Sequence, residues 1–295
     1  MGEIADINDL VDSDITASVG ITGGYGIITA IDVYHTFDIT TPFGEPSDAI
    51  IVGELNGTDV AFVPRHGQGH TIPSHEVNYR ANMYALYALG VSHVISAIAA
   101  GSLNEEIPPG SVVFPTDYID ETVERHDTFF DEEPVHHFSS ADPFCANLID
   151  LAMTQADEAG LSSYTDATAV VIEGPRFATQ AESHKYRSFG ADIINMSVYP
   201  EVALARELEF CFLNLALITD YDIGDVGDVN HEPVTLEMID EIQEQYNPKS
   251  TRLIKRIVSR LPLHSVDCCS GYRESARKSG HPDWEYAVKD RDSGT

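Results

Sequence analysis

Residues 76–101, EVNYRANMYALYALGVSHVISAIAAG, hold the pattern that decides the fold. The first part of this stretch, Glu76–Leu89, places apolar side chains at helical spacing and ends at Gly90, a residue that commonly follows the last turn of a helix. The second part, Ser92–Ala99, is a short and nearly uninterrupted apolar run, which is typical of a strand buried on both faces. The stretch therefore predicts a helix followed by an inner strand of a sheet.

The same alternation continues on both sides of this stretch. The predicted strands are Ala17–Ile21, Asp48–Leu55, Val60–Val63, Ser92–Ala99, Ser111–Phe114, Ala167–Ile172, Ile193–Met196 and Phe210–Thr219. The predicted helices are Glu76–Leu89, Cys145–Ala159, Glu182–Phe189, Glu201–Leu208 and Thr235–Arg260. Strands that alternate with helices predict an α/β fold, and Asn56-Gly57 predicts a tight hairpin between two of the strands. We predict one domain over residues 1–264 and a polar C-terminal tail over residues 265–295, where the periodicity ends.

The chain is strongly acidic. Among its 295 residues, 17 Lys and Arg stand against 48 Asp and Glu, so the formal net charge is 17 − 48 = −31. This charge argues against nucleic acid or an anionic membrane as a partner, because phosphate groups attract Lys and Arg. No run approaches the ~20 apolar residues of a membrane span, and the acidic N-terminus lacks a signal-peptide pattern, so we expect a cytoplasmic protein. Repulsion among so many like charges suggests a halophilic protein in a salt-rich cytoplasm; an ordinary acidic enzyme is the alternative.

The acidic residues are unevenly distributed along the chain. From Val60 to Asn104 the sequence contains a single acid, Glu76. Burial explains part of such a gap, since charged side chains are seldom buried unpaired. The same window nevertheless keeps Arg65, His66, His70, His75, Arg80 and His93. We interpret it as a locally positive anion site, with a core strand and helix that have polar edges as the alternative.

Two glycine-containing motifs follow predicted strands. Gly20–Gly26, GITGGYG, exposes backbone N–H groups that can hold phosphate, although a plain tight turn is the alternative and its spacing is not that of a dinucleotide-binding loop. Arg65–Thr71, RHGQGHT, places an Arg after a strand, where its rigid fork suits an oxyanion. Arg-His-Gly also opens the histidine phosphatases, so a phosphatase with His66 as nucleophile is an alternative.

Two further motifs lie in the second half of the chain. The first combines Glu173–Glu182 with Gly190–Ser197, and the second is Thr219–Asp222 at the end of an apolar strand. Because side chains alternate along a strand, we expect Asp220 and Asp222 to point the same way. One of two adjacent carboxylates has a raised pKa and can carry a proton at neutral pH. An Asp at this place can instead cap the following helix.

The four cysteines give little information by their positions. They are Cys145, Cys211, Cys268 and Cys269, with neither a metal-ligand spacing nor a disulfide framework. We therefore predict no metal, and interpret the adjacent pair only as a redox-sensitive spot.

Together the motifs resemble those of the methylthioadenosine phosphorylases within the purine nucleoside phosphorylase family. The resemblance runs from about Val19 to Leu261. It rests on eight blocks: Gly20–Gly26, Thr41–Asp48, Arg65–Thr71, Val77–Asn82, Ala100–Leu103, Glu173–Glu182, Asn195–Glu201 and Thr219–Asp222. It implies a single-domain α/β fold with a mixed, partly barrel-like central sheet flanked by helices. It also implies no cofactor or metal, inorganic phosphate as co-substrate, and a homotrimer or a dimer of trimers.

The resemblance further implies a role for each motif residue. The catalytic residues would be Arg65, His66, Asp220 and Asp222. Phosphate would lie against Tyr25, Arg65, His66, Ile98, Ala99 and Ser197. The nucleoside would contact Phe177, Ala178, Asn195, Met196, Asp220, Asp222 and Leu236, with His137 extending to the neighbouring subunit.

The implied reaction is phosphorolysis of the N-glycosidic bond of S-methyl-5′-thioadenosine and adenosine, in purine and methionine salvage. It requires an anion near C1′ and a protonated leaving base, but no nucleophilic side chain. Asp220 and Asp222 favour a 6-amino purine, whereas Ala178 resembles the general nucleoside phosphorylases, so a 6-oxopurine or broad-specificity phosphorylase is the nearest alternative. Tyr25 and Ile98 replace small hydroxyl residues usual in the family, which makes a non-catalytic purine-binding protein a more distant alternative.

Overall fold

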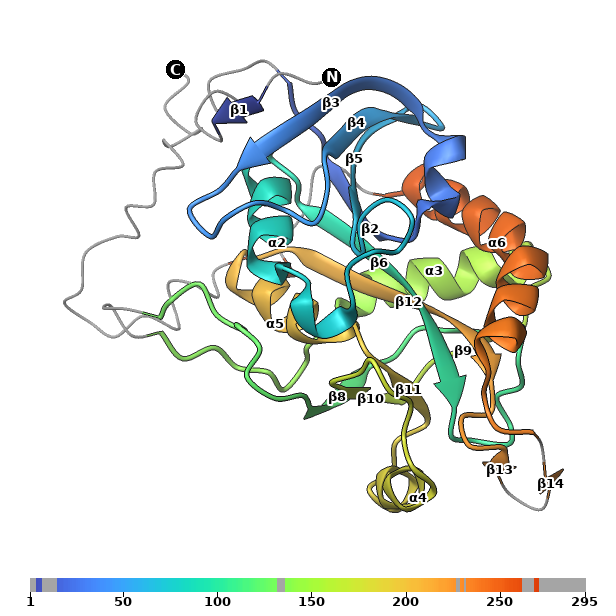
Figure 1. The fold of residues 1–295 in the computed structure, drawn as a ribbon. Helices are drawn as coiled ribbons and strands as arrows, with labels where there is room; N and C mark the ends of the chain where they lie inside the picture. The colour runs from blue at the N-terminus through green and yellow to red at the C-terminus, as the bar shows by residue number, and fades with distance from the viewer. Residues whose placement is uncertain are drawn as a thin grey trace.

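The computed structural model describes residues 4–6, 15–131, 136–226, 229–230, 232–261 and 268–270. A mixed β-sheet forms its centre and helices flank the sheet, which confirms the predicted α/β fold (Figure 1). The strands are β1 (Ile4–Asp6), β2 (Val19–Gly23), β3 (Asp32–Thr40), β4 (Ile50–Leu55), β5 (Thr58–Pro64), β6 (His93–Ser102), β7 (Val112–Val113), β8 (Asp117–Glu121), β9 (Ser163–Tyr164), β10 (Thr168–Ile172), β11 (Ile193–Asn195), β12 (Cys211–Asp220), β13 (Asp225–Val226) and β14 (Val229–Asn230). The helices are α2 (Tyr79–Ala88), α3 (Ala146–Glu158), α4 (Gln180–Ser188), α5 (Val198–Glu207) and α6 (Leu236–Val258), with 3₁₀ helices η1 (Tyr25–Ala30) and η2 (Ser74–Glu76).

Strand β6 organises the sheet. One of its edges pairs in parallel with β12 over most of its length. Its other edge pairs first with β2, in parallel, and then with β11, antiparallel through Gly101 and Ser102. The sheet continues from β2 through β5, β4 and β3 to β1, and from β11 through β10 to β8. β6 is thus the strand at which the two arms of this mixed sheet meet.

The stretch 76–101 forms α2 and β6, as predicted, but the helix begins later than its pattern suggests. Asn78 occupies the N-cap of α2, and its side-chain oxygen accepts the backbone N–H of Ala81 at 3.1 Å. Glu76 belongs to the preceding 3₁₀ turn η2. The cap residue therefore fixes the start of the helix, because an Asn side chain satisfies a backbone donor that the first helical turn leaves free.

The predicted hairpin is formed by β4 and β5. Asn56 and Gly57 have φ values of 57° and 84°, the left-handed conformation that a two-residue turn requires. The sequence patterns do not predict β3, which pairs with the other edge of β4. Most side chains of β3 are exposed, so this strand lacks the apolar alternation that marks a half-buried strand.

The helices pack in pairs around the sheet. α2 contacts α5 on one side, whereas α3 and α6 contact each other and β12 on the other (Figure 1). Of the predicted tail, only Cys268–Ser270 lies within the described residues, and Cys269 there is 5% exposed and part of the hydrophobic core. This part of the segment therefore packs on the domain. Among the described helices, none is long and apolar enough to cross a membrane.

Candidate active site

Parallel strands bring the predicted site segments to one edge of the sheet. Gly24 follows β2, Arg65 and His66 follow β5, and Asp220 ends β12. Gly101 of β6 pairs with both β11 and Asp220, so the segment after β11 reaches the same region. Ligand sites in α/β folds form at the carboxyl ends of such strands, which makes this edge the candidate site.

Arg65 lies in a buried ion pair that the sequence does not predict. Its side chain is 2% exposed, and its Nε and Nη2 donate to Glu201 at 2.7 and 3.0 Å. Nη2 also donates to the hydroxyls of Thr22 and Ser96 at 2.8 and 2.9 Å, while Nη1 donates to the Ala97 carbonyl at 3.0 Å. A guanidinium has five N–H groups, so these bonds leave about one for a ligand. Most of the Arg65 fork is therefore engaged within the protein, and its contact with an oxyanion stays a prediction.

His66 is held as a neutral ring. Its Nδ1 lies 3.0 Å from the Ile72 carbonyl, and its ring stacks on His70 with centroids 4.4 Å apart. A carbonyl only accepts hydrogen bonds, so Nδ1 carries the proton and Nε2 is left as an acceptor. Burial, and next the charge of Arg65, lower the pKa of His66 to about 3. His66 is thus uncharged at neutral pH.

The predicted locally positive site between Val60 and Asn104 is consequently not formed by Arg65 and His66. Glu201 neutralises Arg65 from outside this window, and His66 is neutral. Most of the window is instead buried in β5, α2 and β6, which is the structural alternative stated above. Backbone N–H groups, together with the remaining N–H of Arg65, are then donors available to an anion at this edge.

The glycine turn after β2 offers such donors. Gly24 is exposed and precedes η1, and a Cβ built on it would meet no atom within 4 Å. Gly23 is more restricted, because its Cβ would lie 3.1 Å from the Ala97 carbonyl oxygen. Tyr25 begins η1, but its side chain lies outside the described part of the chain. The turn therefore leaves open space above its backbone.

Hydrogen bonds tie the Thr41–Asp48 loop to two other motif blocks. A carboxylate oxygen of Asp48 accepts the backbone N–H of Gln68 at 2.6 Å, within the loop that follows Arg65. The Asn82 side chain of α2 accepts the backbone N–H of Ser47 at 2.8 Å. These bonds join blocks that are far apart in the sequence, so each loop depends on the other for its shape.

Asp220 and Asp222 lie together, but not for the reason that the strand period suggests. Asp220 ends β12, whereas Asp222 has a φ of 51° and belongs to the following turn. The backbone N–H of Asp222 donates to Asp220 Oδ1 at 2.8 Å, and the Thr219 hydroxyl donates to Asp220 Oδ2 at 2.7 Å. A side-chain-to-backbone turn therefore holds the two carboxyl groups together.

The Asp222 carboxyl group has an unsatisfied oxygen. Asp222 is 3% exposed, and its Oδ2 has no hydrogen-bond partner of good geometry among the described residues, although the buried Ser183 hydroxyl lies near enough to lower its pKa. Burial is the main cause that raises its pKa to about 6, and the neighbouring Asp220 charge acts in the same direction. Burial also raises the pKa of Asp220. Gly101 is required beside this pair, because a Cβ there would lie 2.8 Å from Asp220 Oδ1.

The segments after β10 and β11 hold four further residues of the predicted site. Asn195 Oδ1 accepts the backbone N–H groups of Ser197 and Val198 at 2.9 and 3.0 Å, so this side chain shapes the start of α5. Met196 and Ala178 pack in one small hydrophobic cluster. Phe177 is among the exposed large apolar side chains. An apolar surface of this kind suits a purine or ribose ring.

The other predicted residues lie on strands, loops and the surface. Ile98 is buried in β6 and Ala99 beside it is half-buried. Leu236, at the start of α6, is 70% exposed, and His137 is also exposed. In the single chain neither Leu236 nor His137 is enclosed by its surroundings.

Sequence reasoning missed Arg125, which positions two of the motifs. This buried side chain donates to the backbone carbonyls of Met196, Tyr199 and Glu173 at 2.9, 2.7 and 2.8 Å, and it pairs with the Glu173 carboxylate at 3.1 Å. Its guanidinium group lies over the ring of Tyr79, which adds a cation–π interaction. Arg125 lies outside every motif, so no local pattern could identify it.

Replacing Arg125 by Lys should lower kcat/KM by about 10²-fold, because a single ammonium cannot bind all these acceptors and the loops at the site will shift by about 1 Å. Arg256→Lys is the matched control, since Arg256 pairs with Glu158 on the outer helices. Steady-state kinetics of both variants test this, and equal losses would contradict a positioning role for Arg125.

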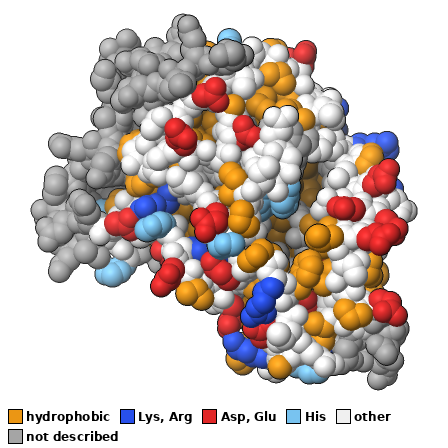
Figure 2. Space-filling view, viewed as in Figure 1, with side chains coloured by type: hydrophobic (Ala, Val, Ile, Leu, Met, Phe, Trp, Pro, Cys, Tyr) orange, Lys and Arg blue, Asp and Glu red, His pale blue; other side chains and the backbone are white. Residues whose placement is uncertain are grey.

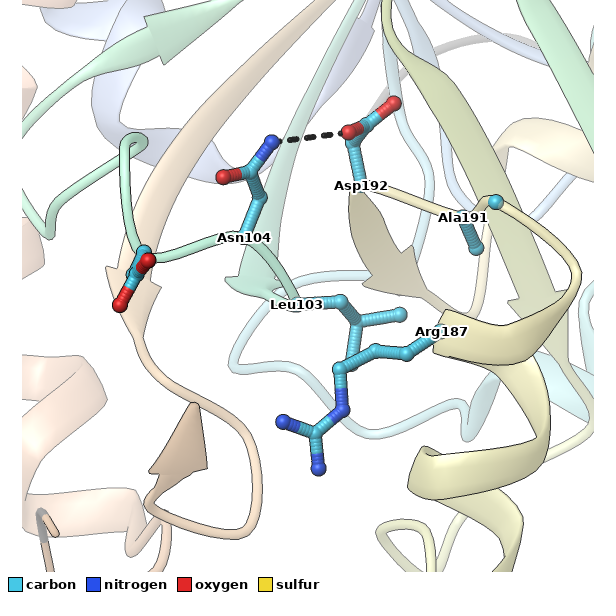
Figure 3. A pocket seen from close by; sticks show the side chains of 7 residues that line it. Leu103, Asn104, Arg187, Ala191 and Asp192 are labelled. Atoms are coloured by element: carbon cyan, nitrogen blue, oxygen red, sulfur yellow. Dashed lines mark hydrogen bonds between the residues drawn. The ribbon is translucent and has the colours of Figure 1, made fainter. Parts of the chain in front are cut away.

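The described surface also contains a cavity of about 310 Å³ beside this edge. Leu103, Asn104, Arg187, Ala191 and Asp192 contribute to its lining, and the Asn104 amide turns toward the Asp192 carboxylate, 3.0 Å away (Figure 3). None of the predicted site residues lines it. We therefore do not assign the nucleoside to this cavity.

Comparison with known proteins places the chain among nucleoside phosphorylases. Residues 18–259 match the sequence profile of the Phosphorylase superfamily. The S-methyl-5'-thioadenosine phosphorylase of Hyperthermus butylicus is 44% identical over 263 residues, which cover 87% of this chain and 94% of that protein. The enzyme of the same name from Saccharolobus solfataricus is 40% identical over 271 residues, 90% of this chain and 98% of that protein.

Solved structures agree with these relatives. The methylthioadenosine phosphorylase of Schistosoma mansoni in complex with adenine has a TM-score of 0.82 and 30% identity, and the alignment covers 89% of this chain and 99% of that one. A methylthioadenosine phosphorylase from an antarctic soil metagenomic library has a TM-score of 0.78 and 38% identity over the same shares. The chain therefore belongs to the phosphorylase superfamily.

Proposed function

We propose that this protein is an S-methyl-5′-thioadenosine phosphorylase, which uses phosphate to release adenine and form 5-methylthioribose 1-phosphate. The buried carboxyl pair at the end of β12 is the observation that carries this function. Asp222 keeps an unpartnered Oδ2 and a raised pKa of about 6. A carboxyl group of this kind can donate a proton to a purine nitrogen as the glycosidic bond breaks.

Phosphate would bind at the same edge of the sheet, opposite the carboxyl pair. The exposed backbone of the glycine turn, the remaining N–H of Arg65, the segment Ile98–Ala99 and Ser197 are its proposed ligands. Neutral His66 can accept a hydrogen bond from a protonated phosphate oxygen through Nε2. Phe177 and Met196 would pack against the purine and ribose, with Leu236 at the 5′ end.

The experiment follows release of the free base from methylthioadenosine, adenosine, inosine and guanosine in high salt, with and without phosphate. Phosphate-dependent release of adenine from methylthioadenosine is the expected result. Faster reaction of inosine or guanosine would instead identify a 6-oxopurine phosphorylase. Release without phosphate would identify a hydrolase, and no release from any nucleoside would favour a purine-binding protein.

Asp220→Asn should reduce activity on 6-amino purines much more than on 6-oxo purines. A carboxylate accepts a hydrogen bond from the exocyclic amino group, whereas the amide of Asn can donate one to a 6-oxo group. The kcat/KM ratio of adenosine to inosine, measured for the parent chain and the variant, checks this. Parallel losses on both substrates would show that Asp220 does not select the base.

We also propose that the chain forms a trimer in which His137 reaches the site of a neighbouring subunit. The exposed positions of His137 and Leu236 support this arrangement. Light scattering gives the mass of the particle, and His137→Ala should raise KM without dissociating it. A monomeric particle with full activity would contradict the proposal. Location in the cytoplasm stays a prediction.

We further propose that the protein is adapted to high salt. Acidic side chains outnumber Lys and Arg on the face drawn in Figure 2, in agreement with the net charge of −31. The Debye length falls from about 10 Å at 0.1 M salt to about 3 Å at 1 M, so added salt screens repulsion that opposes the folded state. The melting temperature should rise between these concentrations of KCl, and equal values would contradict the adaptation.

A further inference from the structure

The four cysteines, which are scattered in the sequence, lie together in the structure. Cys145 is the N-cap of α3, Cys211 begins β12, and Cys268 and Cys269 follow α6. All four Sγ atoms lie within 4.8 Å of one another. No sequence pattern marks this cluster, because its members meet only when α3, β12 and the segment after α6 pack together.

The distances between the sulfur atoms indicate a shared centre. Cys268 Sγ lies 3.7 Å from Cys145 Sγ, 3.5 Å from Cys211 Sγ and 3.7 Å from Cys269 Sγ. A disulfide would join one cysteine to a single partner at about 2 Å, and the four cysteines are free. Four thiolates at about 2.3 Å from a tetrahedral ion lie about 3.8 Å apart. The observed spacing is close to that value.

We propose that Cys145, Cys211, Cys268 and Cys269 form a structural zinc site. Four protein ligands close the coordination shell, so the ion has no position for water or substrate. Strand β12 separates Cys211 at its start from Asp220 at its end by about 30 Å. The ion therefore takes no part in the proposed phosphorolysis, and it joins the segment after α6 to α3 and β12.

The surroundings of the cluster suit an anionic metal centre. Three of the cysteines are buried and Cys268 is exposed, so one side of the cluster faces solvent. A cavity of about 360 Å³ lined by Cys145, Cys268, Cys269 and Arg206 gives the ion a route in. The N-terminus of α3 favours a thiolate at Cys145, because its free N–H groups carry partial positive charge. Zinc binding releases the thiol protons to solvent.

The test uses the full chain, reduced and made metal-free, then exposed to Zn²⁺ or Co²⁺ and passed through gel filtration. Element analysis should find about one zinc per chain, and the cobalt form should show the intense bands of a tetrahedral thiolate complex. The double variant C268S/C269S should lose this metal, whereas Ser270→Ala, the matched control, should retain it. Chelation should lower the melting temperature without changing kcat measured well below it.

Three results would overturn the proposal. Reduced protein that takes up no zinc, with all four thiols reactive, would show that the sulfur atoms merely pack together. A mass lower by two hydrogens for each cysteine pair in protein purified without reductant, together with no zinc uptake after reduction, would show a disulfide site. Equal zinc in the double variant would place the ion elsewhere. None of these readouts depends on activity, so failure of the zinc site and failure of the proposed phosphorolysis are distinguishable.

Discussion

Replacing Asp222 by Asn is expected to lower kcat/KM for methylthioadenosine by about 10²–10⁴-fold while making the protein more stable. The loss of activity follows because an amide cannot transfer a proton to the leaving purine. Asp222 Oδ2 is one of the buried side-chain oxygens without a hydrogen-bond partner among the described residues, and we propose that it meets the base. Both carboxyl oxygens of Asp220, by contrast, already accept hydrogen bonds from the Thr219 side chain and the Asp222 backbone.

The gain in stability has a definite pH range. The pKa of Asp222 is raised to about 6 in the folded protein, above the value of about 3.9 in an unfolded chain. Folding therefore favours the protonated form of Asp222. The stability that the protonated carboxyl group contributes is complete below about pH 4 and is lost as pH rises through about 6. Two pKa units correspond to about 3 kcal/mol, which Asp222→Asn should recover at pH 7.

Kinetics and unfolding together check the Asp222 prediction. In the parent chain kcat/KM should fall above about pH 6, as free Asp222 loses its proton, and this decline should be absent in the variant. Denaturant unfolding at pH 4 and pH 7 measures the stability. A variant that keeps full activity, or that loses stability at pH 7, would show that Asp222 is not the proton donor described here.

Glu201→Gln is expected to destabilise the fold by about 3–5 kcal/mol, because removal of one partner from a buried ion pair leaves the other charge uncompensated. Arg65 is 2% exposed and cannot reach solvent. The carboxylate also accepts hydrogen bonds from the hydroxyls of Thr22 and Ser96 at 3.1 and 2.7 Å. For a domain of this size the loss corresponds to a melting temperature lower by roughly 6–20 °C.

Glu207→Gln is the matched control on the same helix. Glu207 is buried as well, but it has no Arg partner among the described residues. There it accepts hydrogen bonds only from the Thr128 hydroxyl and the Phe129 backbone N–H, at 2.6 and 2.7 Å. Burial, as the main cause, raises its pKa to about 7, so its neutral form is already populated at neutral pH. We expect a change within about 1 kcal/mol. Equal melting temperatures for the two variants would contradict the role given to the ion pair.

The partner of Glu201 and the conformation of Asp222 cannot be predicted from local sequence patterns. The motif block Asn195–Glu201 includes Glu201, but no local pattern says that its carboxylate crosses the fold to Arg65. The sequence predicts Asp220 and Asp222 as a pair, and they lie close together, because residues two apart in the chain cannot be far apart in space. The strand period was nevertheless the wrong reason, since Asp222 lies in a turn at a φ of 51°.

The sequence alone predicts the strands buried on both faces, the helices with an apolar side and the turn at Asn56-Gly57. It can do so because the hydrophobic period and the turn residues act locally. The exposed strand β3 does not, since its hydrogen bonds to β4 depend on a partner and not on its own pattern.

The sequence also determined that the chain is strongly acidic, and it brought Gly24, Arg65 and Asp220 to notice, which the fold places at one edge of the sheet. Only the tertiary structure decided the charges at the site, because Arg65 is neutralised by Glu201 and His66 by burial. It also decided the thiol cluster, which joins Cys145 and Cys211 to the segment after α6. Ionisation and metal binding depend on which groups meet in space, and that is settled when distant segments pack.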